Sequence, residues 1–448
     1  MKDVFLKKNQ TLRLVLGKNP SKQETAPANR TATVTGKFGN GGQGAVYKIR
    51  LDDTGEEKAL KWYFAKTIQE SNNLRTYLED NIARGTPSPS YLWPEYLTEE
   101  IDGIFGYVMP LIPKGYIEYS KYLLANASFS NCEAMVNAAL NIVEAFKDLH
   151  ATGLNYQDFN DTNFSVRPED GSLVIFDNDN VMGQGHHSGV MGKKRYMAPE
   201  VVRGEKMPDK YTDRYSMSLI LFLVLVGDHP LEGLKTNIPC LTNKYDRRFF
   251  GEQPLFIFDK DSRDNAPVVG KHRNAIACWP YFPEYIQQAF QTSFSQESLL
   301  KSNGRLQETE WLHLLMRLKS SIIHCPHCGE EIFVGSSNTT VCAECHKKIP
   351  LAGYLRFADR TNMEINVPIY EGISLYEYHM DSRSVDFQTK RAVIRVKPGK
   401  FGLENQSGRE WTVETPRGKR TIPHGGTMVL VTGAKINFGA NTAEVVEI

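Results

Sequence analysis

The sequence predicts an α+β protein of several domains, in which a β-rich lobe, a helical lobe and two small modules follow one another. Three observations support this prediction. The chain has 448 residues, which is more than one domain usually holds. Alternating apolar and polar residues around glycine clusters give way to long stretches of helical periodicity. Two pairs of closely spaced cysteines then precede a region of short strands broken by turns.

Composition and charge are those of an ordinary globular protein. Hydrophobic residues make up 41% of the chain, charged residues make up 23%, and the formal net charge is +1. This balance provides no overall attraction to nucleic acid or to an anionic membrane. The N-terminus lacks the continuous apolar segment of a signal peptide, and the longest apolar run, LILFLVLVG, is too short to span a bilayer. With three further single cysteines, these features predict a cytoplasmic protein without a membrane partner.

The β-rich lobe contains a glycine-rich segment, GNGGQGAVYK. It places Gly39, Gly41 and Gly44 in GxGxxG spacing, with Val46 two residues further on. Glycines let backbone N–H groups approach phosphates, and a branched side chain can cover a flat base. The same spacing occurs in dinucleotide-binding folds, where a helix follows it. Whether this segment forms a hairpin or opens a helix therefore decides what it binds.

A lysine follows on the next strand-like run, KALKWY. Alternation directs Lys61 to the same face as Ala59, beneath the glycine-rich segment. Helical periodicity then begins, and Glu70 flanks the apolar stripe of the expected helix. A glutamate at this place would hold the Lys61 ammonium against the α- and β-phosphates of a nucleotide. Glu79 is the alternative partner, and a solvated surface charge is the alternative role for Lys61.

The stretch GLNYQDFNDTNFSV follows a helix that is expected to end at Gly153. It contains Asp158 and Asn163, and the apolar strand LVIF then ends at Asp177. Phosphoryl transfer needs a carboxylate that accepts a hydroxyl proton, together with an amide and a second carboxylate that hold a metal ion. We therefore predict Asp158 as the catalytic base, with Asn163 and Asp177 as ligands of Mg²⁺ or Mn²⁺. One such residue alone would more often be a turn or cap residue.

With these residues, the chain resembles the protein kinase superfamily over roughly residues 31–320, which implies a bilobal protein kinase-like fold and ATP as the phosphate donor. Further landmarks are YMAPE, which contains Glu200, and NGRLQETEWLHLL, which contains Arg305. The resemblance implies that Glu200 and Arg305 pair within the C-terminal lobe. It also implies that Asp213, at the start of the hydrophobic helix, anchors the backbone of the loop that holds Asp158.

The segment GYVMPLI resembles the strand and hinge that bind adenine, with Met109 at the gatekeeper position. Pro110 would keep its carbonyl as an acceptor for the adenine amino group, and Ile112 would keep an N–H donor. With YLWPEYL and FDNDN, this hinge resembles the bacterial kinases of tellurite-resistance-associated phosphorylation triads. That finer resemblance implies a von Willebrand-type protein and a PP2C phosphatase as partners.

The catalytic loop departs from the kinase pattern. Gln157 replaces an arginine that clamps a phosphorylated activation segment, which predicts activity without phosphorylation of that segment. Tyr156 replaces a histidine and preserves an aromatic body. Asn160 replaces a lysine that contacts the γ-phosphate, which predicts slower chemistry. The basic run at 193–195 is expected to be a solvated surface, with compensation for the missing lysine as the alternative.

The triplet Asp177-Asn178-Asp179, called the metal triplet because it begins with the predicted ligand Asp177, departs from the kinase pattern as well. Asn178 cannot reproduce the packing of the usual phenylalanine, and Asp179 stands where glycine is usual, either assisting the metal or facing solvent. The leading hypothesis is an ATP- and Mg²⁺-dependent protein kinase that phosphorylates Ser or Thr in an unknown protein substrate. The altered triplets make a pseudokinase scaffold the alternative. A small-molecule phosphotransferase would share the site residues but would not need the YMAPE segment or Arg305.

The four paired cysteines predict a metal site. Cys325 and Cys328 form one CxxC pair, and Cys342 and Cys345 form a second pair after thirteen intervening residues. Four thiolates on two such knuckles make a closed tetrahedral site, which indicates structural Zn²⁺ in a zinc ribbon. No patch of basic and aromatic residues surrounds the knuckles, so a nucleic-acid partner is not expected.

The last region is typical of a small all-β sandwich. FGLENQSGREWTV and GGTMVLVTGAKINFG resemble the final strands of a forkhead-associated domain, but the earlier Arg and Ser signature of that family is not identifiable. A docking module without assigned phosphothreonine-binding residues is therefore expected. The predicted domains are an N-terminal extension (1–30), a protein kinase-like domain (31–322, with an N-lobe at 31–112 and a C-lobe at 113–322), a zinc ribbon (323–352) and a forkhead-associated-like sandwich (360–448).

Overall fold

A computed structural model describes most of the chain, with short gaps. The described residues are 2–19, 21–22, 24–71, 73–183, 192–240, 242–302, 304–335, 339–357, 365–397, 399–415 and 418–446. The chain forms two compact units. Unit 1 comprises residues 1–129, 141–272 and 291–308, and unit 2 comprises residues 130–140, 273–290 and 309–448. The predicted kinase-like region therefore contributes segments to both units.

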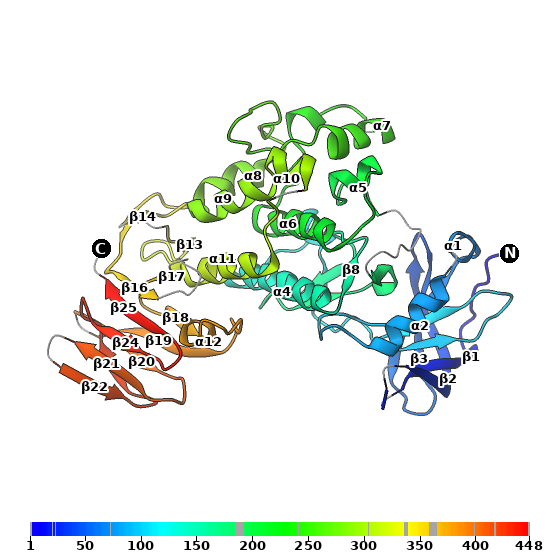
Figure 1. The fold of residues 1–448 in the computed structure, drawn as a ribbon, viewed down its shortest axis with the longest axis horizontal. Coiled ribbons are helices and arrows are strands. Elements are labelled where there is room, and N and C mark those ends of the chain that lie inside the picture. Colours follow the sequence, from blue (N-terminus) through cyan, green and yellow to red (C-terminus); the bar gives the residue numbers. More distant parts are fainter. Residues whose placement is uncertain are drawn as a thin grey trace. The chain divides into compact units, whose positions relative to one another are not determined.

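Unit 1 begins with a closed barrel of strand order β1-β2-β3-β4-β6-β5, drawn in blue and cyan in Figure 1. Its strands are β1 (Thr11–Lys18), β2 (Thr25–Asn40), β3 (Gly44–Leu51), β4 (Glu57–Tyr63), β5 (Tyr96–Thr98) and β6 (Gly106–Met109). Leu12 and Leu14 alternate with exposed residues along β1 and are buried in a cluster that contains Val34 and Ile49. The first thirty residues therefore supply barrel strands, in contrast to the predicted N-terminal extension.

Two helices follow β4. They are α1 (Ala65–Glu70) and α2 (Leu74–Arg84). The buried side chains of α2 include Leu74, Leu78 and Ile82, which recur at the spacing of one helical face and join a second apolar cluster of the barrel. Extended backbone at Ser71 ends α1, so the two helices are separate.

The helical part of unit 1 is organised by α6 (Lys210–Val226). Asp209 accepts hydrogen bonds from the N–H groups of Tyr211 and Thr212, and the Thr212 hydroxyl accepts one from the Asp209 N–H, which forms a capping box. Nearly all side chains of α6 are buried, as expected for a helix that is apolar on most of its surface. The other helices with residues in unit 1 are α3 (Ser120–Leu123), α4 (Cys132–Ala151), α5 (Pro199–Arg203), α7 (Asn243–Arg247), α9 (Glu284–Ser293), α10 (Gln296–Lys301), α11 (Glu308–Ser320), η2 (Leu234–Thr236) and the π-helix η3 (Arg248–Glu252).

Short strands position the predicted catalytic loop. The strand β8 (Leu154–Tyr156) pairs with β11 (Val181–Gly183) in an antiparallel ladder. A second sheet has the order β10-β9-β7, formed by β10 (Leu173–Ile175), β9 (Phe164–Val166) and β7 (Ile117–Glu118). The 3₁₀ helix η1 (Asn178–Asn180) links β10 to β11. The strand pairings therefore fix both ends of the loop between β8 and β9 and both ends of the turn between β10 and β11.

Unit 2 contains two small hairpins and a β-sandwich. The hairpins are β12 (Ile322–His324) with β13 (Glu331–Phe333), and β14 (Thr339–Val341) with β15 (Lys348–Pro350). One sandwich sheet has the order β17-β16-β25-β24-β21-β22 and the other has the order β18-β19-β20-β23. The hairpins and both sheets share one hydrophobic cluster, which includes Ile349, Leu355 and Trp411.

The sandwich begins earlier than the predicted boundary at residue 360, because β16 pairs with both β17 and β25. Its strands are β16 (Tyr354–Phe357), β17 (Ile365–Pro368), β18 (Ser374–Tyr376), β19 (Lys390–Lys397), β20 (Lys400–Asn405), β21 (Trp411–Thr415), β22 (Gly418–Ile422), β23 (Thr427–Val429), β24 (Lys435–Asn437) and β25 (Thr442–Val446). The helical elements of unit 2 also include α8 (Arg273–Cys278), η4 (Trp279–Tyr281) and α12 (Glu377–Met380).

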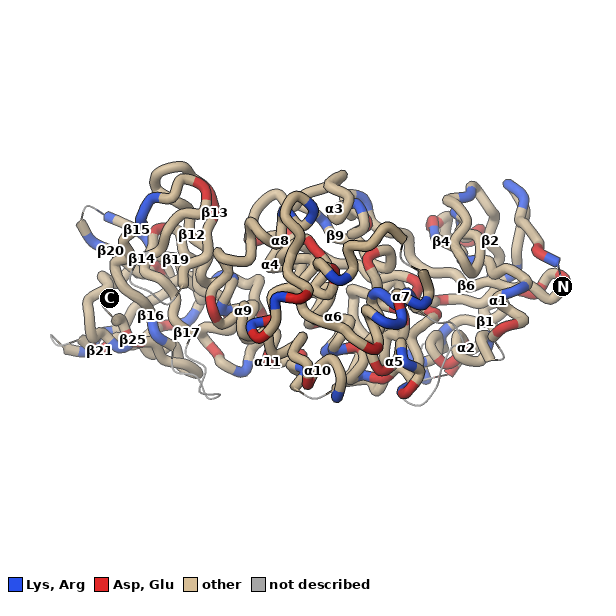
Figure 2. Tube along the Cα trace, turned by 90° about the horizontal axis from the view of Figure 1, so that it is seen from above, with Lys and Arg blue, Asp and Glu red and all other residues tan. Residues whose placement is uncertain are grey.

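The distribution of charged residues and the polarity of the helices agree with the composition of the sequence. Basic and acidic residues are interspersed along the trace (Figure 2). Among the described residues, every helix is too short or too polar to cross a bilayer.

Candidate active site and cysteine cluster

The glycine-rich segment forms a β-hairpin between β2 and β3, and it does not open a helix. Gly39 pairs with Val46 across the hairpin, and the Gly41 N–H donates to the Gly44 carbonyl at 2.8 Å. A Cβ on Gly44 would lie 2.4 Å from the Trp62 carbonyl oxygen, so glycine is needed there for close packing on β4. A Cβ on Gly39 would meet no atom within 4 Å. The space beside Gly39 is therefore open to a ligand.

The residues predicted to contact a base and its phosphates meet on one face of this barrel. Val46 pairs with Lys61 between β3 and β4, and Lys61 pairs with Tyr107 on β6. Ala59 pairs with Met109, and both side chains are buried. Val46, Ala59, Tyr107 and Met109 belong to one apolar cluster. The cluster offers an apolar wall next to the lysine, as a nucleotide site requires.

The predicted hinge follows the end of β6. Pro110 is partly exposed and Ile112 is exposed, while Leu111 between them packs against the apolar cluster. Pro110 keeps its carbonyl group and Ile112 keeps both of its backbone polar groups. These groups therefore lie next to the apolar wall.

Lys61 is bound by acids other than the one the sequence pattern favoured. Its ammonium lies 2.9 Å from Asp179 and 3.4 Å from Asp177, and it donates to the Gln43 side-chain carbonyl at 2.8 Å. Burial opposes the charge on Lys61, but Asp177 and Asp179 together raise its pKa above the usual value. The lysine is therefore a buried cation at neutral pH.

Glu70 and Glu79, the two predicted partners of Lys61, lie elsewhere. The Glu70 side chain is 66% exposed, and its carboxylate lies 3.7 Å from Lys66 one turn earlier. Glu79 pairs with Arg75 at 3.1 Å on α2. The physical reason is the break between α1 and α2, which separates Glu70 from the apolar stripe that it was expected to flank. The structure therefore differs from the sequence prediction for the lysine partner.

Asp179 is held in a polar cage within unit 1. It is only 3% exposed, which excludes the solvent-facing alternative. The Tyr63 hydroxyl donates to its carboxylate at 2.6 Å and the Tyr107 hydroxyl lies at 3.4 Å. Burial raises the pKa of both tyrosines well above the usual range, so both hydroxyls remain donors. In the sequence, the only sign of this arrangement is an acid at position 179, where glycine is usual. The tyrosine partners of Asp179 become apparent only from the strand pairing of the barrel.

Asp158 and Asn163 occupy the loop between β8 and β9. The Asn163 amide donates to the Asp158 carbonyl at 2.7 Å, and the Asn160 amide donates to the Asp158 carboxylate at 3.0 Å. Burial is the main reason that the pKa of Asp158 is raised above its usual range, although the N–H of Lys193 opposes this shift. A raised pKa suits a carboxylate that accepts a proton during catalysis.

Asp177 follows β10 in a left-handed backbone conformation. Its φ is 59° and its ψ is 42°, a region that Asp enters more readily than most side chains. The Tyr156 hydroxyl donates to the carbonyl of Phe176 and lies 3.3 Å from the Asp177 carbonyl. Tyr156 therefore has a polar role besides its aromatic packing, because its hydroxyl connects the catalytic loop to the turn that contains Asp177.

A buried network of hydrogen bonds and charged groups supports the catalytic loop. The Asp213 carboxylate accepts a hydrogen bond from the Tyr156 N–H at 2.7 Å and lies 3.1 Å from the His150 ring. The other His150 nitrogen lies 2.9 Å from Glu308. Burial opposes protonation, but the two acids raise the pKa of His150 to about 9. The predicted anchoring of the loop by Asp213 is confirmed.

We expect the contribution of His150 to the stability of the fold to decrease as the pH becomes alkaline. Because its pKa is about 9 in the folded chain and near 6.5 in an unfolded one, its contribution is complete below about pH 6.5 and is lost as pH rises through 9. Melting temperatures of the native protein and of His150→Gln should therefore converge between pH 7 and 10. Parallel curves over this range would contradict a charged His150.

The Glu200–Arg305 pair is also confirmed. The guanidinium contacts the two carboxylate oxygens at 2.8 Å each, and both side chains are buried. Arg305 also donates to the carbonyls of Tyr211 and Ser298. A bidentate ion pair with further hydrogen bonds ties the start of α5 to the segment before α11.

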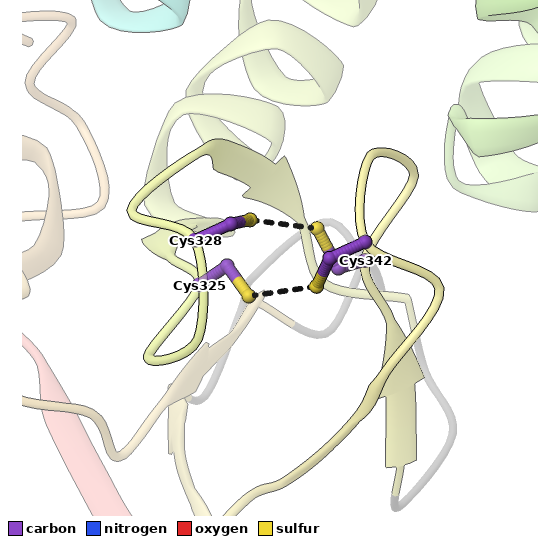
Figure 3. A group of neighbouring side chains, drawn as sticks. Cys325, Cys328 and Cys342 are labelled. Carbon is purple, nitrogen blue, oxygen red and sulfur yellow. Dashed lines mark hydrogen bonds between the residues drawn. The ribbon is translucent and has the colours of Figure 1, made fainter.

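The four paired cysteines of unit 2 converge. Their sulfur atoms all lie within 4.8 Å of one another. The Cys325 and Cys345 sulfurs are 3.6 Å apart, as are those of Cys328 and Cys342, and Figure 3 shows the three labelled cysteines facing one another. A disulfide would require about 2.05 Å. Tetrahedral Zn–S bonds of about 2.3 Å place sulfurs about 3.8 Å apart, so both the donor set and its geometry fit a zinc ion.

The two cysteine pairs lie on matching knuckles. The Gly329 N–H donates to the Cys325 carbonyl at 2.9 Å, and the His346 N–H donates to the Cys342 carbonyl at 3.0 Å. Each turn thus brings the second cysteine of its CxxC pair back over the first.

Comparison with known proteins places the chain in a family. A family model described as the protein kinase domain matches residues 32–256, which is half of the chain. The serine/threonine-protein kinase AtPK2/AtPK19 of Arabidopsis thaliana is 29% identical over 209 residues, which cover 45% of this chain and 42% of that relative. The RAC family serine/threonine-protein kinase homolog of Dictyostelium discoideum is 27% identical over 220 residues, 48% of each chain. The match therefore spans less than half of each relative. The chain belongs to the protein kinase domain family.

Proposed function

We propose that the protein is an ATP- and Mg²⁺-dependent protein kinase that transfers the γ-phosphate of ATP to a Ser or Thr hydroxyl. The observation that supports it most is that Lys61, Asp158, Asn163 and Asp177 all lie in unit 1, where Lys61 contacts Asp177 and Asn163 contacts Asp158. A scaffold has no physical need for the complete set.

Each residue has one role in this proposal. Asp158 accepts the proton of the acceptor hydroxyl, and Lys61 holds the α- and β-phosphates below the hairpin of Gly41 and Gly44. Asn163 and Asp177 would hold Mg²⁺, and an amide and a carboxylate are oxygen donors that suit it. When bound, the ion would neutralise charge on the phosphates during transfer.

A pseudokinase scaffold is the second candidate function, because the metal triplet departs from the kinase pattern. Asn178 is buried and donates to the carbonyls of Leu92 and Ile175, which is polar packing in place of an aromatic side chain. Incubation with γ-labelled ATP and Mg²⁺, alone and with a generic protein substrate such as casein, separates the two. Label on Ser or Thr is expected. Nucleotide binding without any label would instead favour the scaffold.

We predict that transfer does not depend on phosphorylation of the activation segment. Gln157, which stands in place of a phosphate-clamping arginine, donates to the Asn155 side chain at 3.3 Å and has no cationic charge to offer a phosphate. Residues 184–191 of that segment lie outside the described residues. Phosphatase-treated and untreated protein should transfer label at the same initial rate. Recovery of activity only after phosphorylation within residues 177–200 would contradict this prediction.

We propose that the cysteine cluster binds a structural Zn²⁺. Cys325 and Cys342 are buried in the same hydrophobic cluster as the sandwich, so loss of the ion is expected to destabilise unit 2. A chelator and Cys342→Ser should each release about one zinc per chain and lower the melting temperature. Cys240→Ser, a change at an exposed single cysteine, is the matched control and should change neither. Unchanged melting after complete metal removal would contradict the structural role.

The finer family assignment is also a proposal. The hinge GYVMPLI, the FDNDN segment and the C-terminal modules support kinship with the bacterial kinases of tellurite-resistance-associated triads. A von Willebrand-type protein and a PP2C phosphatase are then the proposed partners, with the forkhead-associated-like sandwich as a docking module. Copurification of these two classes of protein with the full chain tests this assignment.

A further inference from the structure

The three residues of the basic run at 193–195 point in different directions. The Lys193 ammonium lies 2.9 Å from the Asn160 side-chain oxygen, 3.1 Å from the Thr162 hydroxyl and 3.4 Å from the Asp161 carboxylate. Lys194 instead lies 3.4 Å from Asn243, and Arg195 pairs with Glu232 at 2.6 Å. Lys193 alone among these three carries its charge into the catalytic loop, so the run is not simply a solvated surface.

Backbone contacts fix the place of Lys193 beside the catalytic carboxylate. Its N–H donates to Asp158 at 3.3 Å. A Cβ on the preceding Gly192 would lie 2.7 Å from the same carboxylate oxygen, so a side chain at position 192 would force a shift of this contact. Asn160 bridges the two charges, because its amide donates to Asp158 and its oxygen accepts from Lys193. The Lys193 side chain nevertheless remains 48% exposed, so its ammonium can contact an arriving ligand.

We propose that Lys193 is a catalytic residue whose ammonium contacts the γ-phosphoryl group during transfer, in place of the lysine that position 160 lacks. This inference rests on the proposed kinase function. The acceptor oxygen forms a bond to the γ-phosphorus, the bond to the β–γ bridging oxygen breaks, and ADP leaves with that electron pair. Asp158 takes the hydroxyl proton, while Lys193 keeps its own protons and offsets charge on the phosphoryl oxygens.

Three variants test the proposal: Lys193→Met, Lys194→Met as the matched control, and the exchange variant Asn160→Lys/Lys193→Thr. For each, kcat for transfer and the Kd values of MgATP and MgADP are measured. Lys193→Met is expected to lower kcat about 10²-fold and to weaken MgATP relative to MgADP, because only ATP carries the γ-phosphate. Lys194→Met should change neither quantity, and the exchange variant should recover part of both losses.

The outcomes separate the inference from the proposed function. A folded Lys193→Met protein with native kcat and a native ratio of the two Kd values would overturn the catalytic role. Equal weakening of MgATP and MgADP, with a lowered melting temperature, would show that Lys193 only braces the loop and would overturn it too. If the native protein transfers no phosphate, the kinase function fails, and the ratio of the Kd values still decides whether Lys193 meets the γ-phosphate.

Discussion

Asp179→Asn is expected to lower kcat/KM for ATP by about 10²-fold while the protein remains folded. The substitution removes the closest carboxylate partner of Lys61, at 2.9 Å, and leaves only Asp177 at 3.4 Å. Lys61 would then be drawn towards Asp177, which is the proposed ligand of the metal ion. Both the phosphate contact and the metal site would be disturbed, so we expect KM to rise and kcat to fall.

Steady-state kinetics with ATP as the varied substrate measure this effect. Tyr63→Phe removes one donor to Asp179 and should give a smaller loss. Glu70→Gln and Glu79→Gln are matched controls that should retain native kinetics, because their carboxylates contact Lys66 and Arg75. If Glu70→Gln or Glu79→Gln were as damaging as Asp179→Asn, one of the partners predicted from the sequence would be the functional one after all.

Arg305→Ala is expected to destabilise unit 1 by about 3–5 kcal/mol, because it leaves the buried Glu200 carboxylate without its charge partner. Denaturant unfolding of the variant measures the change. Arg13→Ala is the matched control: Arg13 also contacts an acid, Glu99 at 2.7 Å, but its side chain is 74% exposed, so a loss of about 0–1 kcal/mol is expected. Similar losses in both variants would mean that the Glu200–Arg305 pair is not buried in solution.

The double variant Glu200→Leu/Arg305→Met separates the ion pair from the packing around it. Removing both charges leaves no unpaired ion, so its loss should be smaller than that of Arg305→Ala. A larger loss would show that the pair contributes more than mutual charge compensation.

Local patterns in the sequence indicate the candidate residues of the site. Gly44, Lys61, Asp158 and Asp177 are residue types that phosphoryl transfer needs, and strand alternation predicts that Lys61 and Ala59 share one face of β4. Asp213 and the Glu200–Arg305 pair followed from the family resemblance, because they serve the scaffold that the resemblance implies.

Long-range packing explains what the sequence left out. Asp179 meets Lys61 across 118 residues, and no local period connects them. Continuous helical periodicity in the sequence favours Glu70, but the extended backbone at Ser71 separates α1 from α2. The basic run at 193–195 predicts a solvated surface, because the contact of Lys193 with Asn160 joins residues 33 positions apart and follows no local pattern. The strand β1 was missed because polar neighbours obscure its alternating leucines.

The most direct test of a working phosphotransferase is the rate of γ-phosphate transfer by the native protein, Asp158→Asn and Asp177→Asn, each compared at equal ATP occupancy. Native transfer is expected, with a fall of at least about 10²-fold in Asp158→Asn because its base is lost, and a comparable fall in Asp177→Asn because its metal ligand is lost. Asp264→Asn, a change at an exposed acid that contacts Lys235, should retain the native rate. Equal transfer by all four proteins would contradict the catalytic assignment, and ATP binding without transfer by the native chain would make it a scaffold.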